Sequence, residues 1–140
     1  MKKAFMSLKF YEGDATKKKV EELTLALEQA GIENFVMIRD VEKYGEVEIS
    51  NKSLMKDYAF PAMEKSDMLI VEFSEKGVGL GIGAGYAFAK NIPIYIIAKN
   101  GSEISSTIEG LAKKIIFYDE MQDITMAFKK IIKEEKNDRY

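Results

Sequence analysis

Short apolar runs recur along the chain and alternate with segments in which apolar residues are spaced three and four apart. The short runs are typical of buried strands, and the second spacing is typical of amphipathic helices. The segment DMLIVEF (67–73) is almost uninterrupted, as in a parallel strand that is covered on both faces. We predict five strands, at residues 2–8, 34–38, 67–73, 92–98 and 114–118.

The segments between these runs predict helices. Residues 15–30 have helical spacing, with Asp14 as the expected N-cap and Gly31 as the expected C-cap. Residues 53–65 and 121–135 have the same spacing. Further predictions are a polar loop at 39–50, a glycine-rich loop that opens a helix through 86–90, and a loop with a short helix at 102–112.

The alternation of strands and helices predicts the fold class. Five strands separated by helices indicate a three-layer, doubly wound α/β fold around a five-stranded parallel sheet. Right-handed crossovers leave few strand orders, and the flavodoxin-like order 2-1-3-4-5 is the commonest at this size. Because the 140 residues contain no internal repeat or linker, we expect a single domain, 1–140.

Composition excludes several kinds of chemistry. The chain has no cysteine and no histidine, which excludes disulfides, thiol catalysis, cysteine metal sites and histidine-based acid–base catalysis. A net charge of −2 predicts no nucleic-acid partner. No apolar run approaches the roughly 20 residues that span a bilayer, and the N-terminal run is too short for a signal peptide. We therefore expect a cytoplasmic protein with no membrane contact, no metal and no cofactor.

The predicted strand order locates a binding site. Ligands of open parallel sheets bind beyond the carboxyl ends of the strands, where the order reverses. In this order that point lies between the first and third strands. The loops at this edge contain Ser7, Lys9, Tyr11, Glu75 and Lys76, the glycine-rich stretch GVGLGIGAG (77–85) and, after strand four, Ser105.

The glycine-rich stretch fits common nucleotide-binding patterns only in part. Gly79, Gly81 and Ala84 match G-x-G-x-x-A, but this dinucleotide fingerprint belongs after the first strand, with an acidic residue at the end of the next. A P-loop is excluded because no Gly-Lys-Ser/Thr follows. The first loop lacks a Ser/Thr-rich cradle for a flavin phosphate, and the acidic residues of a receiver domain are missing.

The segments SDMLIVEF (66–73) and GVGLGIGAGYA (77–87) resemble the central motif of the nucleoside 2-deoxyribosyltransferases and the related 2'-deoxynucleoside 5'-monophosphate N-hydrolases. The similarity extends through residues 100–112 and covers most of the chain up to Tyr118. It implies a deoxynucleoside or nucleotide as the small-molecule partner. It also implies a reaction in which a carboxylate attacks C1' of the sugar while the base leaves, after which water or a second base takes the sugar.

The resemblance also implies roles for individual residues. Asp57 would be the acid that assists departure of the base. Ser105 would reach the substrate phosphate in a neighbouring subunit, which implies a homodimer or larger homo-oligomer. The residues that would contact the substrate are Ser7, Lys9, Tyr11, Lys76, Gly77, Gly79 and Gly81.

The chain departs from the family pattern at the nucleophilic Glu, whose position is occupied by Gly83. Glycine in a helix loses roughly 0.5–1 kcal/mol against Ala, and Glu in a first turn gains up to ~1 kcal/mol, so folding alone does not explain Gly83. The chain is then an inactive relative, a substituted variant of an active enzyme, or an enzyme with another carboxylate. Glu75 is the first candidate for such a carboxylate, whereas Glu72, within its strand, is expected to play a supporting role.

Three functions are open from the sequence. The first is an enzyme that cleaves or exchanges the N-glycosidic bond of deoxynucleosides or their 5'-monophosphates. The second is a nucleotide-binding or nucleotide-sensing module that has kept the pocket and lost the chemistry. The third is a structural α/β domain whose apolar helix faces bind a partner.

Overall fold

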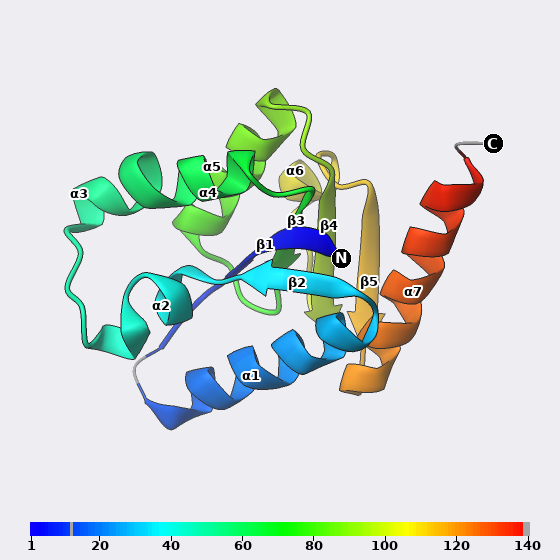
Figure 1. Ribbon diagram of the computed structural model, residues 1–140, viewed down its shortest axis with the longest axis horizontal. Helices are drawn as coiled ribbons and strands as arrows, with labels where there is room; N and C mark the ends of the chain where they lie inside the picture. Colours follow the sequence, from blue (N-terminus) through cyan, green and yellow to red (C-terminus); the bar gives the residue numbers. More distant parts are fainter. Residues whose placement is uncertain (12, 139–140) are drawn as a thin grey trace.

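Five parallel strands form one sheet in the order β2-β1-β3-β4-β5, as the sequence predicted (Figure 1). The structure is a computed structural model that describes residues 1–11 and 13–138. The strands are β1 (Lys2–Leu8), β2 (Ile32–Phe35), β3 (Met68–Glu72), β4 (Ile94–Lys99) and β5 (Lys114–Tyr118). The helical segments are α1 (Asp14–Gln29), α2 (Met37–Asp40), η1 (Lys43–Gly45), α3 (Asn51–Ser53), η2 (Leu54–Ala59), α4 (Phe60–Glu64), α5 (Val78–Ala89), α6 (Ser106–Glu109) and α7 (Met121–Asn137).

Helices cover both faces of the sheet, which gives the predicted three layers (Figure 1). On one face, α1 and α7 pack on side chains such as Met6 and Ile97. On the other face, η2, α4, α5 and α6 pack on side chains such as Phe5, Val71 and Ile96. Because both faces are covered, every residue of β3 is buried, which explains its uninterrupted apolar run.

The register of the sheet places the ends of β1 and β3 side by side. Ser7 lies opposite Val71, and Leu8 lies opposite Glu72. The segments that follow these two strands therefore leave the sheet at the same edge. This is the reversal point of the strand order, where a ligand site was expected.

The second strand and its connection differ from the prediction. β2 ends at Phe35, and the one-turn helix α2 occupies Met37–Asp40, where the sequence predicted the end of a strand and the start of a loop. The Asp40 carboxylate accepts a hydrogen bond from the Val36 backbone N–H at 2.9 Å and pairs with Arg39 at 2.8 Å. These contacts turn the chain into a helix directly after the strand. Burial opposes ionisation of Asp40, but the hydrogen bonds from Arg39 and Val36 outweigh it and lower its pKa.

The glycine-rich stretch forms a helix rather than the predicted loop. α5 begins at Val78, with Gly77 as its N-cap, so four of the five glycines lie within regular helix. None of these five glycines has a positive φ, so their conformations do not require glycine. The chain runs straight from the end of β3 through a short loop into the helix, and glycine brings bare backbone to the helix surface.

The segment before β3 is helical throughout, as predicted, but it is not regular. Its middle part, η2, is a π-helix that lies between α3 and α4. Pro61 lies in the first turn of α4, directly after η2, and has no N–H to donate to the preceding turn. The wider turn of η2 places Met55, Ala59 and Met63 on the side that faces the sheet. Wider helical turns of this kind are frequent at functional sites.

Among the described residues, no helix is long and apolar enough to cross a membrane. Residues 1–11 and 13–138 also contain no group of three or more Asp or Glu side chains placed to hold a metal ion.

Candidate functional site

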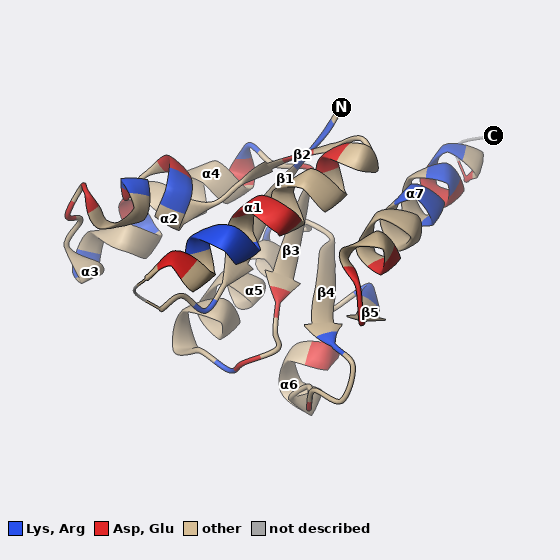
Figure 2. Ribbon diagram, turned by 90° about the horizontal axis from the view of Figure 1, so that it is seen from below, with Lys and Arg blue, Asp and Glu red and all other residues tan. Residues whose placement is uncertain are grey.

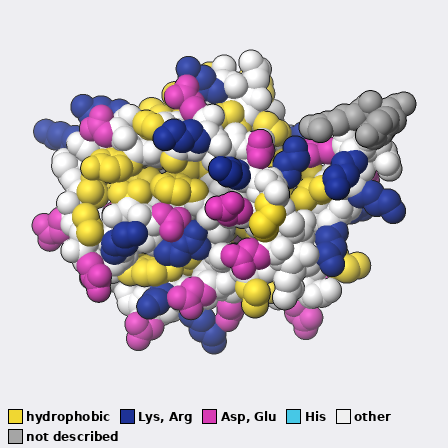
Figure 3. All heavy atoms as spheres, in the orientation of Figure 1, with side chains coloured by type: hydrophobic (Ala, Val, Ile, Leu, Met, Phe, Trp, Pro, Cys, Tyr) yellow, Lys and Arg dark blue, Asp and Glu magenta, His cyan; other side chains and the backbone are white. Residues whose placement is uncertain are grey.

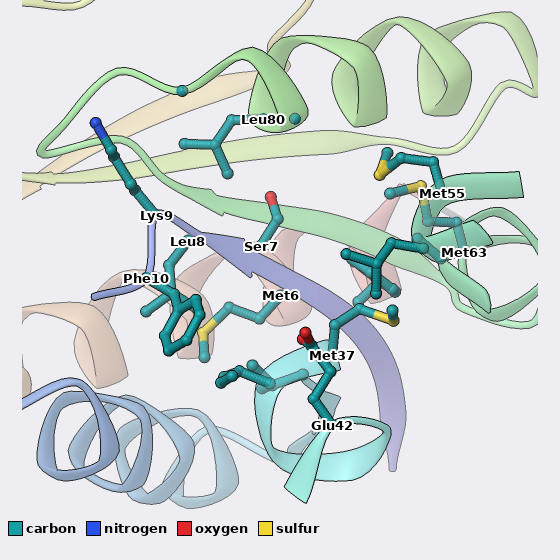
Figure 4. A pocket seen from close by; sticks show the side chains of 17 residues that line it. Met6, Ser7, Leu8, Lys9, Phe10, Met37, Glu42, Met55, Met63 and Leu80 are labelled. Atoms are coloured by element: carbon teal, nitrogen blue, oxygen red, sulfur yellow. The ribbon is translucent and has the colours of Figure 1, made fainter. Parts of the chain in front are cut away.

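A pocket of about 240 Å³ opens at the carboxyl end of β1, between the segment that follows β2 and the start of α5 (Figure 4). The loop after β1 forms one wall, the first turn of α5 forms another, and the segment from α2 to α4 closes the rest. Most of its lining is apolar, and it includes four of the eight methionines of the chain. The lining residues are Phe5, Met6, Ser7, Leu8, Lys9, Phe10, Val36, Met37, Ile38, Glu42, Leu54, Met55, Ala59, Met63, Gly77, Gly79 and Leu80.

Ser7 brings a polar group to this apolar pocket. Its hydroxyl oxygen is buried and, among the described residues, has no hydrogen-bond partner. In Figure 4 the hydroxyl points from β1 toward Leu80, at the start of α5. A buried hydroxyl without a partner costs about 1–3 kcal/mol, so a ligand atom that bonds to it regains that energy on binding.

A second depression, of about 630 Å³, continues from the pocket along the same edge of the sheet. Lys9 and Gly77 line both hollows, so the two form one cleft. The second hollow contains four of the sequence-predicted residues besides Gly77: Lys9, Lys76, Gly81 and Ser105. Both lysines are exposed. They bring two positive charges to this part of the cleft, next to hydroxyl groups of Ser105 and Thr107.

Ser105 is the N-cap residue of α6. Its side chain makes no capping hydrogen bond, so its hydroxyl is not used within the helix. The structure places Ser105 in the cleft of its own chain. Its predicted contact with the site of a neighbouring subunit stays a prediction.

Gly83 is buried in α5, behind the wall of the pocket. A Cβ atom at this position would lie 2.9 Å from the Cε methyl of Met63 and 3.9 Å from that of Met55. The methyl ends of the two methionines, which also line the pocket, are thus the nearest side-chain atoms to a Cβ at position 83. A side chain at position 83 would require the flexible end of Met63 to shift, which is a small adjustment, so the packing does not require glycine and the sequence expectation about Gly83 stays open.

Three other sequence-predicted residues lie outside the pocket. Asp57 is exposed and lines a separate hollow on the side of β2, together with Tyr58 and Pro61. Tyr11 is exposed, lines neither part of the cleft, and contacts the Lys9 ammonium group, which lies 5.6 Å from its ring centre. Glu75 is exposed and lines neither part of the cleft. The structure thus does not bring the two candidate carboxylates, Asp57 and Glu75, to the pocket.

Glu42 is the residue of the pocket that sequence reasoning missed. It is the only acidic residue among the described residues that line the pocket, and burial raises its pKa. It lies in the polar stretch that was predicted as a loop. A signal was present, because the predicted order 2-1-3-4-5 also brings the carboxyl end of strand two to this edge. The sequence reasoning followed only the loops after strands one, three and four.

Glu72 is fully buried at the end of β3 but faces away from the pocket, toward α1 and β5. Its carboxylate accepts hydrogen bonds from the Ser74 N–H at 2.6 Å, the Ser74 hydroxyl at 2.9 Å and the Tyr118 hydroxyl. The Lys19 ammonium lies 3.2 Å away. Burial and the neighbouring Glu72 carboxylate raise the pKa of Tyr118. Glu72 thus has the supporting role expected for it, since it fixes the loop that leads into α5.

Comparison with known proteins shows several solved structures that share this fold. No family model matches the chain, and no curated protein matches it. Among solved structures, the CMP N-glycosidase BcmB of Clostridium botulinum is 20% identical with a TM-score of 0.66, over 93% of this chain and 99% of that one. The 2-deoxyribosyltransferase of Bacillus psychrosaccharolyticus is 12% identical with a TM-score of 0.68, over 88% and 90% of the two chains. A conserved protein of Enterococcus faecalis V583 has a TM-score of 0.74 at 13% identity, over 94% and 99%.

Proposed function

We propose that this protein is a relative of the nucleoside 2-deoxyribosyltransferases and N-glycosidases that binds a deoxynucleoside or its 5'-monophosphate, without catalysis by a carboxylate at position 83. The observation that carries this proposal is the cleft at the reversal point of the sheet. It combines an apolar pocket, an unpartnered serine hydroxyl and a neighbouring hollow with two lysines.

The two parts of the cleft suit the two ends of a nucleotide. The apolar pocket, with Met37 and Met6 in its walls, suits the flat face of a base, because thioethers pack well against aromatic rings. The exposed backbone at Gly77 and Gly79 allows the sugar to come close to α5. A 5'-phosphate would lie toward Lys9 and Lys76, whose ammonium groups bind phosphate as point charges.

Gly83 argues against the family's covalent chemistry in this chain. A carboxylate nucleophile must reach C1' of the sugar, and glycine offers no reacting group. The methyl ends of Met63 and Met55 lie beside it, and neither can act as a nucleophile in place of a carboxylate. The fold shared with an N-glycosidase and a deoxyribosyltransferase supports the nucleoside as ligand. The packing at position 83 supports binding without this route to bond cleavage.

Calorimetric titration with a panel of deoxynucleosides and their 5'-monophosphates tests this proposal. Gly79 lines the pocket and Gly85 does not, and a Cβ at either position has open space around it. We expect binding by the wild-type protein and the Gly85→Trp variant, and at least ~10-fold weaker binding by Gly79→Trp, whose indole would fill the pocket. The absence of heat with every ligand, or equal binding by all three proteins, would count against the proposal.

Cleavage or transfer at the N-glycosidic bond is the second candidate function, favoured by Glu42 in the pocket wall. Chromatography of the same panel after incubation would detect a released base. We expect none from the wild-type protein. Release that is lost in Glu42→Gln would replace the binding proposal with an enzyme whose catalytic carboxylate is Glu42.

The double variant Gly83→Glu, Met63→Ala tests whether the pocket still holds a nucleoside in a reactive position. The change at Met63 makes room for the new side chain at position 83.

A further inference from the structure

The backbone of Glu42 is fixed by hydrogen bonds on both sides. Its N–H donates to the Met37 carbonyl at 3.0 Å, and its carbonyl accepts from the N–H groups of Gly45 and Val47, each at 3.0 Å. The next residues, Lys43 and Tyr44, have φ angles of 50° and 54°, which non-glycine residues rarely adopt. The chain thus accepts a strained turn directly after Glu42, and strain of this kind is often found at ligand sites.

The carboxyl group of Glu42 extends into the pocket. In Figure 4 it rises from the α2 side and ends between Met6 and Met37. Within residues 1–11 and 13–138, no group donates a hydrogen bond to it and no cation pairs with it. Glu42 is half-buried, and this partial loss of water contact raises its pKa.

A ligand that displaces water from the pocket would have to supply hydrogen-bond donors to this half-buried carboxyl group in place of that water. A carboxylate only accepts hydrogen bonds, so a ligand must present N–H or O–H donors to it. Of the other polar side chains in the lining, the Ser7 hydroxyl points toward α5, and Lys9 extends away from Glu42 (Figure 4). The nearby walls are the apolar side chains of Met6 and Met37. A flat ring that lies between them would turn its edge toward Glu42.

We propose that Glu42 makes the pocket selective for nucleobases that carry an exocyclic amino group, through hydrogen bonds from that group to its carboxyl oxygens. This inference rests on the proposed nucleoside-binding function. Cytosine, adenine and guanine carry such a group, whereas uracil, thymine and hypoxanthine have a carbonyl oxygen or a hydrogen in its place. A carbonyl oxygen that faces the carboxylate would leave both acceptors unpaired, which is the stronger form of discrimination.

Two matched pairs of ligands test the selectivity. Deoxycytidine differs from deoxyuridine at the 4-amino group, and deoxyguanosine differs from deoxyinosine at the 2-amino group. We expect the wild-type protein to bind the amino-bearing member of at least one pair roughly 10- to 100-fold more tightly, as for a hydrogen bond to a charged group. In Glu42→Gln, whose amide both donates and accepts, the ratio should fall to within about threefold of one.

Glu75→Gln is the matched control, because it makes the same chemical change at an exposed carboxylate outside the cleft. It should keep the wild-type ratio. An equal ratio in the wild-type and Glu42→Gln proteins, with both still binding nucleosides, would overturn the role of Glu42 and leave the proposed function intact. A wild-type protein that binds no nucleoside would overturn both. A merely structural role for Glu42 would weaken both members of a pair equally and leave their ratio unchanged.

Discussion

At the scale of single residues, Gly83 and Glu42 decide what the pocket can do. Gly83 leaves the start of α5 without a reacting group, and Met63 packs where a side chain would begin. Among the described residues that line the pocket, Glu42 supplies the only carboxylate, and it comes from a different part of the chain. The motif around Gly83 was readable from the sequence because its residues are contiguous. Glu42, Met55 and Met63 could not be identified in the same way, since only the folded chain brings them to the pocket.

Replacement of Gly83 by Glu should destabilise the protein by ~2–4 kcal/mol. The new Cβ would push against Met63, and the carboxylate would lie among apolar side chains without a partner. Urea unfolding measures this cost. Gly85→Glu is the control, because Gly85 lies exposed on the same helix with open space around it, and the change should be neutral or stabilise by up to about 1 kcal/mol. Equal stability of the two variants would show that position 83 is not packed as described.

Glu42 should make stability depend on pH. Burial raises its pKa above the ordinary value of 4.5, so the folded protein holds this proton more tightly than the unfolded chain. Its contribution to the free energy of unfolding is then full below pH 4.5 and is lost as the pH rises through the folded-state pKa.

We expect Glu42→Gln to remove this loss. At pH 7 the variant should be more stable than the wild-type protein, and at pH 4 the difference should shrink, because both side chains are then neutral. Urea unfolding at the two pH values measures the change, with exposed Glu46→Gln as control. A stability difference that does not vary with pH would contradict the burial of this carboxyl group.

At the scale of elements, the apolar runs predicted the strands well because a buried parallel strand needs side chains that suit both faces. β1 and β5 match their predicted limits. The prediction failed at β2 and α5. There, specific contacts decide the backbone conformation against the expectation from hydrophobic spacing and glycine content. The Asp40 carboxylate accepts a hydrogen bond from the Val36 N–H, and this contact starts α2 early. In α5, glycine favours loops by propensity, but packing of Leu80 and Ala84 on the sheet holds the segment helical.

The loop from β3 to α5 depends on Glu72, which Tyr118 and Lys19 hold from two other elements. Tyr118→Phe removes one donor from a buried carboxylate and should cost roughly 1.5–3 kcal/mol, as for a hydrogen bond to a charged group. Thermal or urea unfolding would measure this loss. Tyr58→Phe makes the same change at an exposed ring and should have no measurable effect. A Tyr118→Phe protein as stable as the wild type would mean that Glu72 finds another donor.

At the scale of the whole molecule, charge is distributed unevenly between the helices. The helices α1 and α7 carry many charged side chains, whereas α5 contains no Lys, Arg, Asp or Glu (Figure 2). Val78 and Phe88 on α5 are 82% and 56% exposed. Figure 3 shows further hydrophobic side chains gathered on the visible face, between the regions of α2 and α4. An uncharged helix that is half exposed is typical of a surface that another chain covers.

We therefore expect a homodimer in solution, with α5 at its interface. The mass from light scattering should be about twice the 15.9 kDa of one chain. Phe88→Glu should shift the protein toward the mass of one chain, because it places a charge in the interface. Met126→Glu changes an equally exposed apolar residue on α7 and should leave the mass unchanged. A single-chain mass for the wild-type protein would rule out this assembly.

The methyl groups of the methionines offer the most direct test of the nucleoside site. Met6, Met37, Met55 and Met63 line the pocket, and Met1, Met68, Met121 and Met126 do not. We would titrate protein labelled with ¹³C at the methionine methyl groups with deoxynucleosides and their 5'-monophosphates, and follow the methyl signals by NMR. We predict that the four pocket signals shift together, under the ring current of the bound base, while the other four stay in place. Shifts confined to methionines outside the pocket, or none with any ligand, would contradict a nucleoside site at the ends of β1 and β3.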